Sequence, residues 1–72
     1  MLNLYKIFLA VADYKSFSKA ANNLYITQPA VSYAIKTLEE NLNTKLFIRK
    51  YNQSILTKEG EILISHIKKA YN

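Results

Sequence analysis

The sequence contains no cysteine and only one glycine, one proline and one histidine. Without cysteine, neither a disulfide nor a thiolate metal site can form. The single histidine, His66, has no second metal ligand at a useful spacing, so we expect no metal site and no cofactor. One glycine cannot supply a glycine-rich loop that cradles phosphates, and no nucleophile stands beside a matching base. The residues therefore give little support to an enzyme.

Long apolar runs are also missing from the chain. None approaches the roughly 20 residues that a transmembrane helix needs. Near the N-terminus, Lys6 and Asp13 interrupt the apolar residues and no small-residue cleavage site follows, so we expect no signal peptide and a cytoplasmic location. The lysines are scattered over several segments rather than gathered on one face, which argues against a helix that lies on a membrane surface.

Acidic residues are scarce, because five Asp and Glu stand against ten Lys and Arg, giving a net charge of +5 and a pI near 9.6. This balance suits a polyanionic partner, although charge alone leaves a membrane surface or an acidic protein open. The 72 residues are 50% hydrophobic, which permits one domain with a small core. Association with a partner subunit is a common way to stabilise such a core.

Two apolar stripes with helical spacing occupy the first third of the chain. Residues 2–14 carry the i, i+3, i+4, i+7 spacing of one helix face at Leu4, Ile7, Phe8 and Val11. Ser16 then stands where an N-cap belongs. The next segment repeats the spacing at Phe17, Ala20, Ala21 and Leu24. We predict a helix over 2–14 and a shorter one after Ser16, whose alanines let another helix approach closely.

The segment 27–42 has the most pronounced amphipathic pattern. Its apolar side chains recur at i, i+4, i+7 and i+11, at Val31, Ile35, Leu38 and Leu42. Thr27 occupies the N-cap position, and Pro29 is tolerated in a first turn. The other face carries the hydrogen-bonding side chains Gln28, Ser32, Tyr33 and Lys36. About fifteen residues at roughly 1.5 Å each suit a DNA major groove, and the preceding short helix completes a predicted helix-turn-helix.

The remaining residues predict a hairpin followed by a last helix. Asn43 favours the left-handed conformation that ends helices. Strands are expected over 46–49 and 54–56, on either side of the polar interval 51–54. Thr57 then caps a helix that continues to the end of the chain, with a short heptad-like stripe at Gly60, Leu63, Ile67 and Ala70. We expect a second copy of the chain to cover this stripe; the alternative is packing onto the first helix, and the two are compatible.

The pieces above occur together in one order and spacing. They comprise Phe8, Val11, Ser16-Phe17, Ala20-Ala21, Leu24, Thr27 to Ser32, Ile35, Leu38-Glu39, Leu42, Leu46-Phe47, Arg49, Leu56-Thr57 and Gly60. Any one piece alone is a weak signal, whereas the whole set covers nearly the entire chain. In this combination the chain resembles the N-terminal DNA-binding domain of LysR-type transcriptional regulators.

The resemblance implies a mainly α fold. A winged helix-turn-helix with a three-helix core and a two-stranded wing would occupy residues 1–56, and a linker helix that joins two copies would begin over 57–72. It implies sequence-specific binding of double-stranded DNA by a homodimer on a pseudo-palindromic site, with helix 27–42 in the major groove and the wing near 49–54 on the backbone or minor groove. It also implies a C-terminal domain that binds a small-molecule effector, which we expect to be absent here.

This sequence departs from the family pattern at several positions. Lys15 and Asn43 stand where glycine is usual, and a left-handed Lys15 would cost roughly 1 kcal/mol. Tyr33 replaces a basic or amide residue of many members, so base preference is expected to differ there. Asn52 stands in place of a second wing arginine and Glu59 in place of alanine, which lowers the positive charge near the DNA.

The residues expected to contact DNA are Ser16, Ser18, Thr27, Gln28, Pro29, Ser32, Tyr33, Lys36, Arg49 and Lys50. Gln28 can pair bidentately with adenine, Arg49 can enter a narrow A/T-rich minor groove, and Lys50 suits a phosphate. Ser16 and Ser18, at the start of the second helix, are expected both to cap it and to place amides and hydroxyls near a phosphate. The residues expected to join two copies are Leu63, Ile67 and Ala70.

Each of these assignments has an ordinary structural alternative. Gln28 can be merely solvated, Pro29 can serve only to start the helix, and Tyr33 can pack against a neighbouring element. Glu39 and Glu40, interpreted as surface charges, could pair with Lys36, although such a pair is worth only about 0.2–0.5 kcal/mol. The alternative function is a winged-helix protein-interaction module, which predicts no salt-dependent binding of duplexes.

Overall fold

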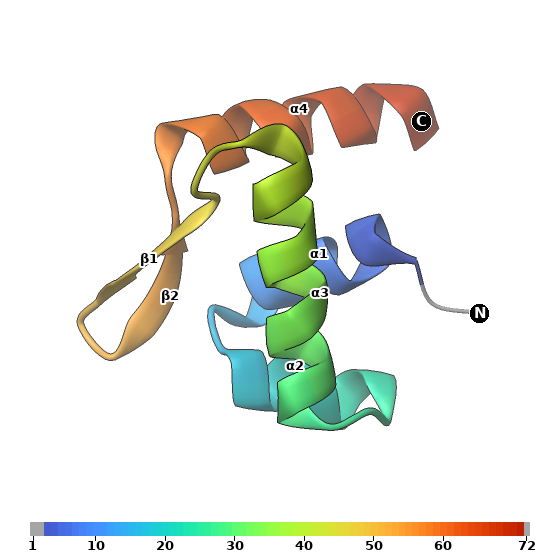
Figure 1. Cartoon of the computed structure of the whole chain (residues 1–72), viewed down its shortest axis with the longest axis vertical. Helices are drawn as coiled ribbons and strands as arrows, with labels where there is room; N and C mark the ends of the chain where they lie inside the picture. The colour runs from blue at the N-terminus through green and yellow to red at the C-terminus, as the bar shows by residue number, and fades with distance from the viewer. Residues whose placement is uncertain (1–2, 72) are drawn as a thin grey trace.

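The computed structural model describes residues 3–71, without the side chain of Tyr71. Its elements are, in chain order, α1 (Leu4–Tyr14), α2 (Phe17–Leu24), α3 (Gln28–Leu42), β1 (Phe47–Lys50), β2 (Gln53–Leu56) and α4 (Lys58–Tyr71). The first three helices pack against one another and the hairpin projects to one side (Figure 1). The last helix, α4, follows the hairpin and contacts β2. This arrangement confirms the predicted winged helix-turn-helix with an additional C-terminal helix.

Side-chain caps determine where the first three helices begin. Ser16 accepts a hydrogen bond from the Lys19 N–H and Thr27 accepts one from the Ala30 N–H, as the sequence predicts. Asn3 caps α1 in the same way. The helix therefore begins at Leu4, whereas the sequence predicted a helix over 2–14. The prediction was wrong at Asn3, which has extended backbone, and residue 2 lies outside the described residues.

The same three helices end without glycine. Lys15, Tyr25 and Asn43 occupy the left-handed C-cap positions, with φ of 54°, 59° and 53°. The positive φ expected at Lys15 and Asn43 is thus present. Left-handed backbone strains a residue that has a Cβ, less so for asparagine, so the turns after α1 and α2 hold backbone strain that glycine would not have.

The core lies where α1, α2 and α3 meet the base of the wing. Its largest fully buried side chains are Phe8, Val11, Val31 and Leu46. The Phe47 ring, from the first residue of β1, packs at 5.4 Å from the ring of Phe8 and at 6.0 Å from that of Phe17, measured between centroids. The predicted stripe of α3 was wrong at Leu42, which is 43% exposed because α3 has by then passed beyond the core.

The wing is a tight antiparallel hairpin. Its register pairs Phe47 with Leu56 and Lys50 with Gln53, so the strands begin or end one residue from the predicted bounds. The turn is therefore only Tyr51 and Asn52, both with positive φ, as a type I′ turn requires. The Ser54 N–H donates to the Lys15 carbonyl at 2.9 Å. This bond attaches the wing to the turn between α1 and α2.

The N-terminus of α4 is bound to the base of the wing. The Thr57 hydroxyl accepts from the Gly60 N–H and donates to the Lys45 carbonyl, which confirms the predicted cap. The Thr57 N–H donates to the Leu46 carbonyl at 2.9 Å. Gly60 is buried directly against that carbonyl, since a Cβ at this position would lie 2.5 Å from the oxygen of Leu46. The single glycine thus serves close packing rather than a turn.

Candidate nucleic-acid interface

The outer face of α3 presents hydrogen-bonding side chains to solvent. Gln28, Pro29, Ser32, Tyr33 and Lys36 are all exposed, whereas the side chains on the opposite face of the helix are buried. Tyr33 is 74% exposed, so it does not pack against the wing or another helix. The structure therefore brings these residues of α3, all predicted to contact DNA, together on one accessible surface.

One hydrogen bond joins this surface to α2. The Ser18 hydroxyl donates to Oε1 of Gln28 at 2.9 Å. Both side chains are exposed, and neither acts as a helix cap, because Ser16 and Thr27 fill those positions. Ser18 and Gln28 were each predicted to face DNA, but the sequence gave no indication that they contact each other.

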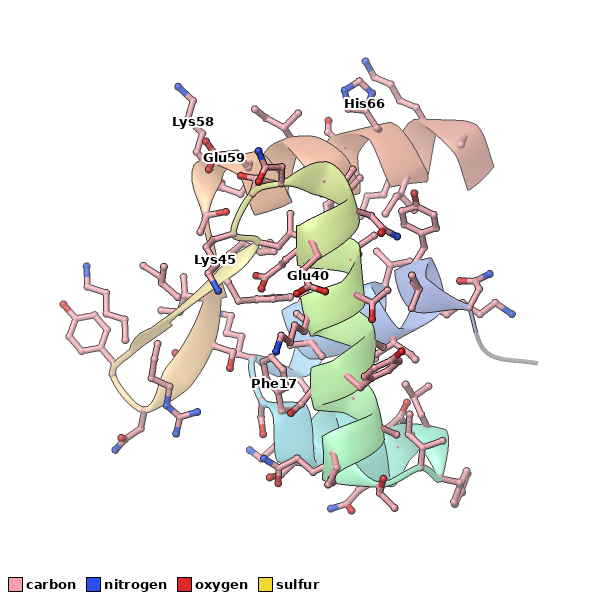
Figure 2. All side chains as sticks on the ribbon, viewed as in Figure 1. Phe17, Glu40, Lys45, Lys58, Glu59 and His66 are labelled. Carbon is pink, nitrogen blue, oxygen red and sulfur yellow. The ribbon has the colours of Figure 1, made fainter. Side chains whose placement is uncertain are left out.

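Glu39 holds the C-terminal half of α3 against the wing. Its Oε2 accepts from the Leu46 N–H at 2.7 Å and from the Phe47 N–H at 3.4 Å. Its Oε1 lies 3.7 Å from the ammonium of Lys45, and Figure 2 shows Lys45 on the wing side of α3. The interpretation of Glu39 as a surface charge was therefore wrong. The Glu39 side chain is 14% exposed and directed at the wing. Its ion-pair partner is Lys45 and not Lys36, which is exposed.

The wing adds two exposed cations beside α3. Arg49 and Lys50 lie on the outward part of β1, and the Lys50 ammonium is 5.4 Å from the centre of the Tyr51 ring. A hollow of about 250 Å³ lies between α3 and the wing, lined by Phe17, Gln28, Ile35, Ile48 and Arg49 among others. The wing guanidinium and the first-turn amide of α3 therefore border the same concave surface.

Two exposed tyrosines near this surface escaped the sequence analysis. Tyr25, in the turn of the helix-turn-helix, is 95% exposed, and Tyr51, at the tip of the wing, is 81% exposed. Both have positive φ. An aromatic residue in a polar turn gives no sign of its exposure in a single sequence, and the turn was expected to extend over 51–54. The exposed aromatic surface near α3 is thus larger than predicted.

The predicted dimer residues of α4 differ in burial. Ile67 is buried in the protein's own core, Leu63 is half-buried against that core, and Ala70 is exposed. An apolar hollow of about 250 Å³ lies along this part of α4, with Tyr5 of α1 on its other side. This chain's own core therefore covers the inner part of the stripe, and Ala70 remains accessible.

The described part of the chain contains no group of three His, Asp or Glu residues that could bind a metal ion. His66 points away from the body of the domain (Figure 2). None of the helices within residues 3–71 is long and apolar enough to cross a membrane.

A short helix, a tight turn, a helix with one polar accessible face and a two-stranded wing beside it define a winged helix-turn-helix domain. The family model of the bacterial regulatory helix-turn-helix proteins of the LysR family matches residues 2–61. The chain belongs to this family, whose members are regulators of transcription rather than enzymes.

Known proteins similar to this chain are transcriptional regulators. The glycine cleavage system transcriptional activator of Escherichia coli K12 is 42% identical over 71 residues, which are 99% of this chain and 23% of the activator. A probable RuBisCO transcriptional regulator of Cyanophora paradoxa is 44% identical over 61 residues, 85% of this chain and 19% of that protein. The chain thus spans about a quarter or less of the length of these curated relatives.

Solved structures show the same architecture. A LysR-family regulator from Eggerthella lenta superposes with a TM-score of 0.86 at 35% identity, covering 94% of this chain and 99% of that one. The BenM_DBD complex with catB site 1 DNA gives a TM-score of 0.86 at 35% identity, covering 97% and 81% of the two chains. The fold is therefore that of a LysR-type DNA-binding domain.

Proposed function

We propose that the chain binds double-stranded DNA sequence-specifically, with α3 in the major groove and the wing on the backbone or in the minor groove. The division of α3 into two faces carries this proposal. Val31 and Leu38 are buried, while Gln28, Ser32 and Tyr33 are exposed. A helix anchored on one side and lined with hydrogen-bonding groups on the other fits a major groove about 12 Å wide. The similar BenM_DBD structure is itself a DNA complex.

The first two turns of α3 supply the base contacts in this proposal. Gln28 pairs with adenine N6 and N7, which discriminates against other bases by about 1–3 kcal/mol. Pro29 meets a thymine methyl group, and Ser32 lies one turn further along the helix. Tyr33 adds an apolar contact through its ring and a phosphate contact through its hydroxyl.

Cations and helix N-termini around α3 supply the phosphate contacts. Lys36 and Lys50 are exposed and suit the backbone, and Arg49 enters the minor groove where it is narrow. Ser16 and Thr27 lie at the N-termini of α2 and α3, where backbone N–H groups favour a phosphate. The net charge of +5 favours the same partner.

The proposed assembly is a homodimer through α4 on a pseudo-palindromic site. The exposed Ala70 and the hollow beside Leu63 and Tyr5 offer an apolar surface that a second copy can cover. Two recognition helices then meet successive major grooves. In a longer protein of this family, we propose that a further domain binds a small-molecule effector and that the protein acts in the cytoplasm.

Selection of randomised duplexes at two salt concentrations tests the binding proposal. The expected result is enrichment of a two-fold related motif, with retention that falls as salt rises. Enrichment of a single half-site would support base readout but would contradict dimer formation by this chain. Retention without enrichment would reject sequence specificity, and no retention at all would favour the protein-interaction module.

A substitution at Ala70 tests the dimer surface separately. Ala70→Glu places a charge on the exposed part of the stripe without touching the core, so we expect sedimentation equilibrium to show a weaker dimer. Ser65→Glu, also exposed on α4, is the matched control and should leave association unchanged. Equal association of the two variants would contradict the proposed surface.

A further inference from the structure

The fold does not require the hydrogen bond between Ser18 and Gln28. The Ser18 hydroxyl donates to Gln28 Oε1 at 2.9 Å across the turn that separates α2 from α3. Both side chains are exposed, so water could satisfy each of them. The helix ends are already capped by Ser16 and Thr27. The bond therefore neither fills a buried site nor completes a helix terminus.

We propose that Ser18 is a positioning residue that holds the amide of Gln28 in the orientation needed for base readout. This inference rests on the proposed function, because it concerns how one base of the DNA site is recognised. It replaces the direct phosphate contact predicted for Ser18. A serine hydroxyl has a single hydrogen, and here that hydrogen is donated to Gln28, so it is not available to a phosphate, which only accepts.

The polarity of the bond suits adenine. Oε1 has two lone pairs and Ser18 occupies one, which leaves the other to accept from adenine N6–H. Within residues 3–71, Nε2 of Gln28 makes no hydrogen bond, so its N–H groups remain free to donate to adenine N7. Oε1 and Nε2 thus present acceptor and donor together. A rotated amide would exchange the two groups and mismatch the adenine edge.

Holding the side chain in advance also reduces the cost of ordering it on binding. A free glutamine on a helix surface samples several rotamers, and immobilising a flexible side chain at an interface costs conformational entropy. A bond from α2 restricts those rotamers before DNA arrives. The benefit is confined to the base pair that Gln28 contacts, since Ser18 itself touches no base in this proposal.

The test compares duplex selection by the wild-type chain with selection by Ser18→Ala, Ser18→Thr and Gln28→Ala. We expect Gln28→Ala to abolish preference at one base position. Ser18→Ala should reduce preference at that same position by about three- to tenfold, the effect of one hydrogen bond, with the other positions and the salt dependence unchanged. Ser18→Thr retains the hydroxyl and should restore the preference. Ser65→Ala, on exposed α4 surface, should match wild type.

Combining the substitutions separates positioning from the other roles of a serine. In the Gln28→Ala background, Ser18→Ala should change nothing further at that position. A uniform loss over all duplexes would instead indicate a phosphate contact and overturn the proposal, as would an effect of Ser18→Ala that persists without Gln28. Loss of stability alone, measured by urea unfolding, with unchanged base preference would also overturn it.

The outcomes also distinguish this inference from the proposed function. If the wild-type chain enriches no motif, sequence-specific binding fails and the inference falls with it. If the wild type enriches a motif and Gln28→Ala flattens one position while Ser18→Ala does not, only the positioning role fails. A readout without DNA is ¹⁵N relaxation of the Gln28 side-chain amide, which we expect to become more mobile in Ser18→Ala; unchanged mobility would contradict the restraint.

Discussion

The carboxylate of Glu39 accepts a hydrogen bond of 2.7 Å from the backbone N–H of Leu46, the residue that precedes the wing. This bond spans the connection between α3 and β1, and a second bond reaches the Phe47 N–H. The helix proposed to read bases and the hairpin proposed to contact the backbone are therefore held together by a side chain that does not itself face DNA.

Removing this carboxylate should destabilise the domain. Glu39→Ala leaves the buried Leu46 N–H without its partner, a loss of about 1–3 kcal/mol in the free energy of unfolding. Urea unfolding measures the change. Glu40→Ala, one residue further along and exposed, is the matched control and should stay within about 0.5 kcal/mol of wild type. Similar values for both variants would show that the bonds of Glu39 contribute nothing.

Glycine at position 15 should stabilise the protein. Lys15 has a φ of 54° at the C-cap of α1, and relief of this left-handed strain is worth roughly 1 kcal/mol. Thermal unfolding of Lys15→Gly should therefore show a raised Tm. Lys19→Gly, in the interior of α2, should lower it by a comparable free energy. A lower Tm for both would mean that the added freedom of the unfolded chain outweighs the strain.

Alanine at position 60 should destabilise the protein although alanine favours helices. An added Cβ would lie 2.5 Å from the Leu46 carbonyl oxygen and 2.7 Å from Cδ2 of Leu56, so α4 must shift away from the wing. We expect a loss of about 1–3 kcal/mol, typical of overpacking, measured by urea unfolding. Ser65→Ala, on exposed α4, should be neutral or slightly stabilising. A stabilised Gly60→Ala would contradict the close packing described at this contact.

Removing a cation that is proposed to contact a phosphate should weaken binding to all duplexes alike. For Lys50→Ala we expect the slope of log K against log salt to become less negative by about 0.9, the value for one phosphate contact, with the selected motif unchanged. Lys69→Ala, in the last turns of α4, keeps the slope if the wing is the contact surface. Fluorescence anisotropy on specific and random duplexes provides both values, and an unchanged slope for Lys50→Ala would remove it from the interface.

Local signals explain how much of the fold the sequence predicts. Ser16, Thr27 and Thr57 mark helix starts because a cap needs only neighbouring backbone N–H groups. The predicted bounds of the wing strands were off by one residue, because neither Tyr51 nor Asn52 is the glycine that usually marks a two-residue turn.

The candidate site was only partly predictable for a different reason. The helical spacing of the apolar residues in α3 predicts which face is exposed, so the exposure of Gln28 and Ser32 was predictable. The bonds from Ser18 to Gln28 and from Glu39 to Leu46 depend on how separate elements meet, which no local pattern encodes. A weak signal existed for Glu39, since it lies four residues after Ile35 and therefore at the edge of the buried face.

The hydrogen bonds of Thr57 attach the start of α4 firmly to the rest of the domain. The first turn of α4 is bound to the base of the wing, and the wing is bound to α3 through Glu39. We therefore expect a rotation of α4 to carry α3, the proposed recognition helix, with it. The 14 residues of α4 extend about 21 Å, so tilting the helix by about 10° displaces its far end by about 4 Å. In the proposed dimer, small angular changes where the two copies meet would therefore alter the distance between their α3 helices by ångströms.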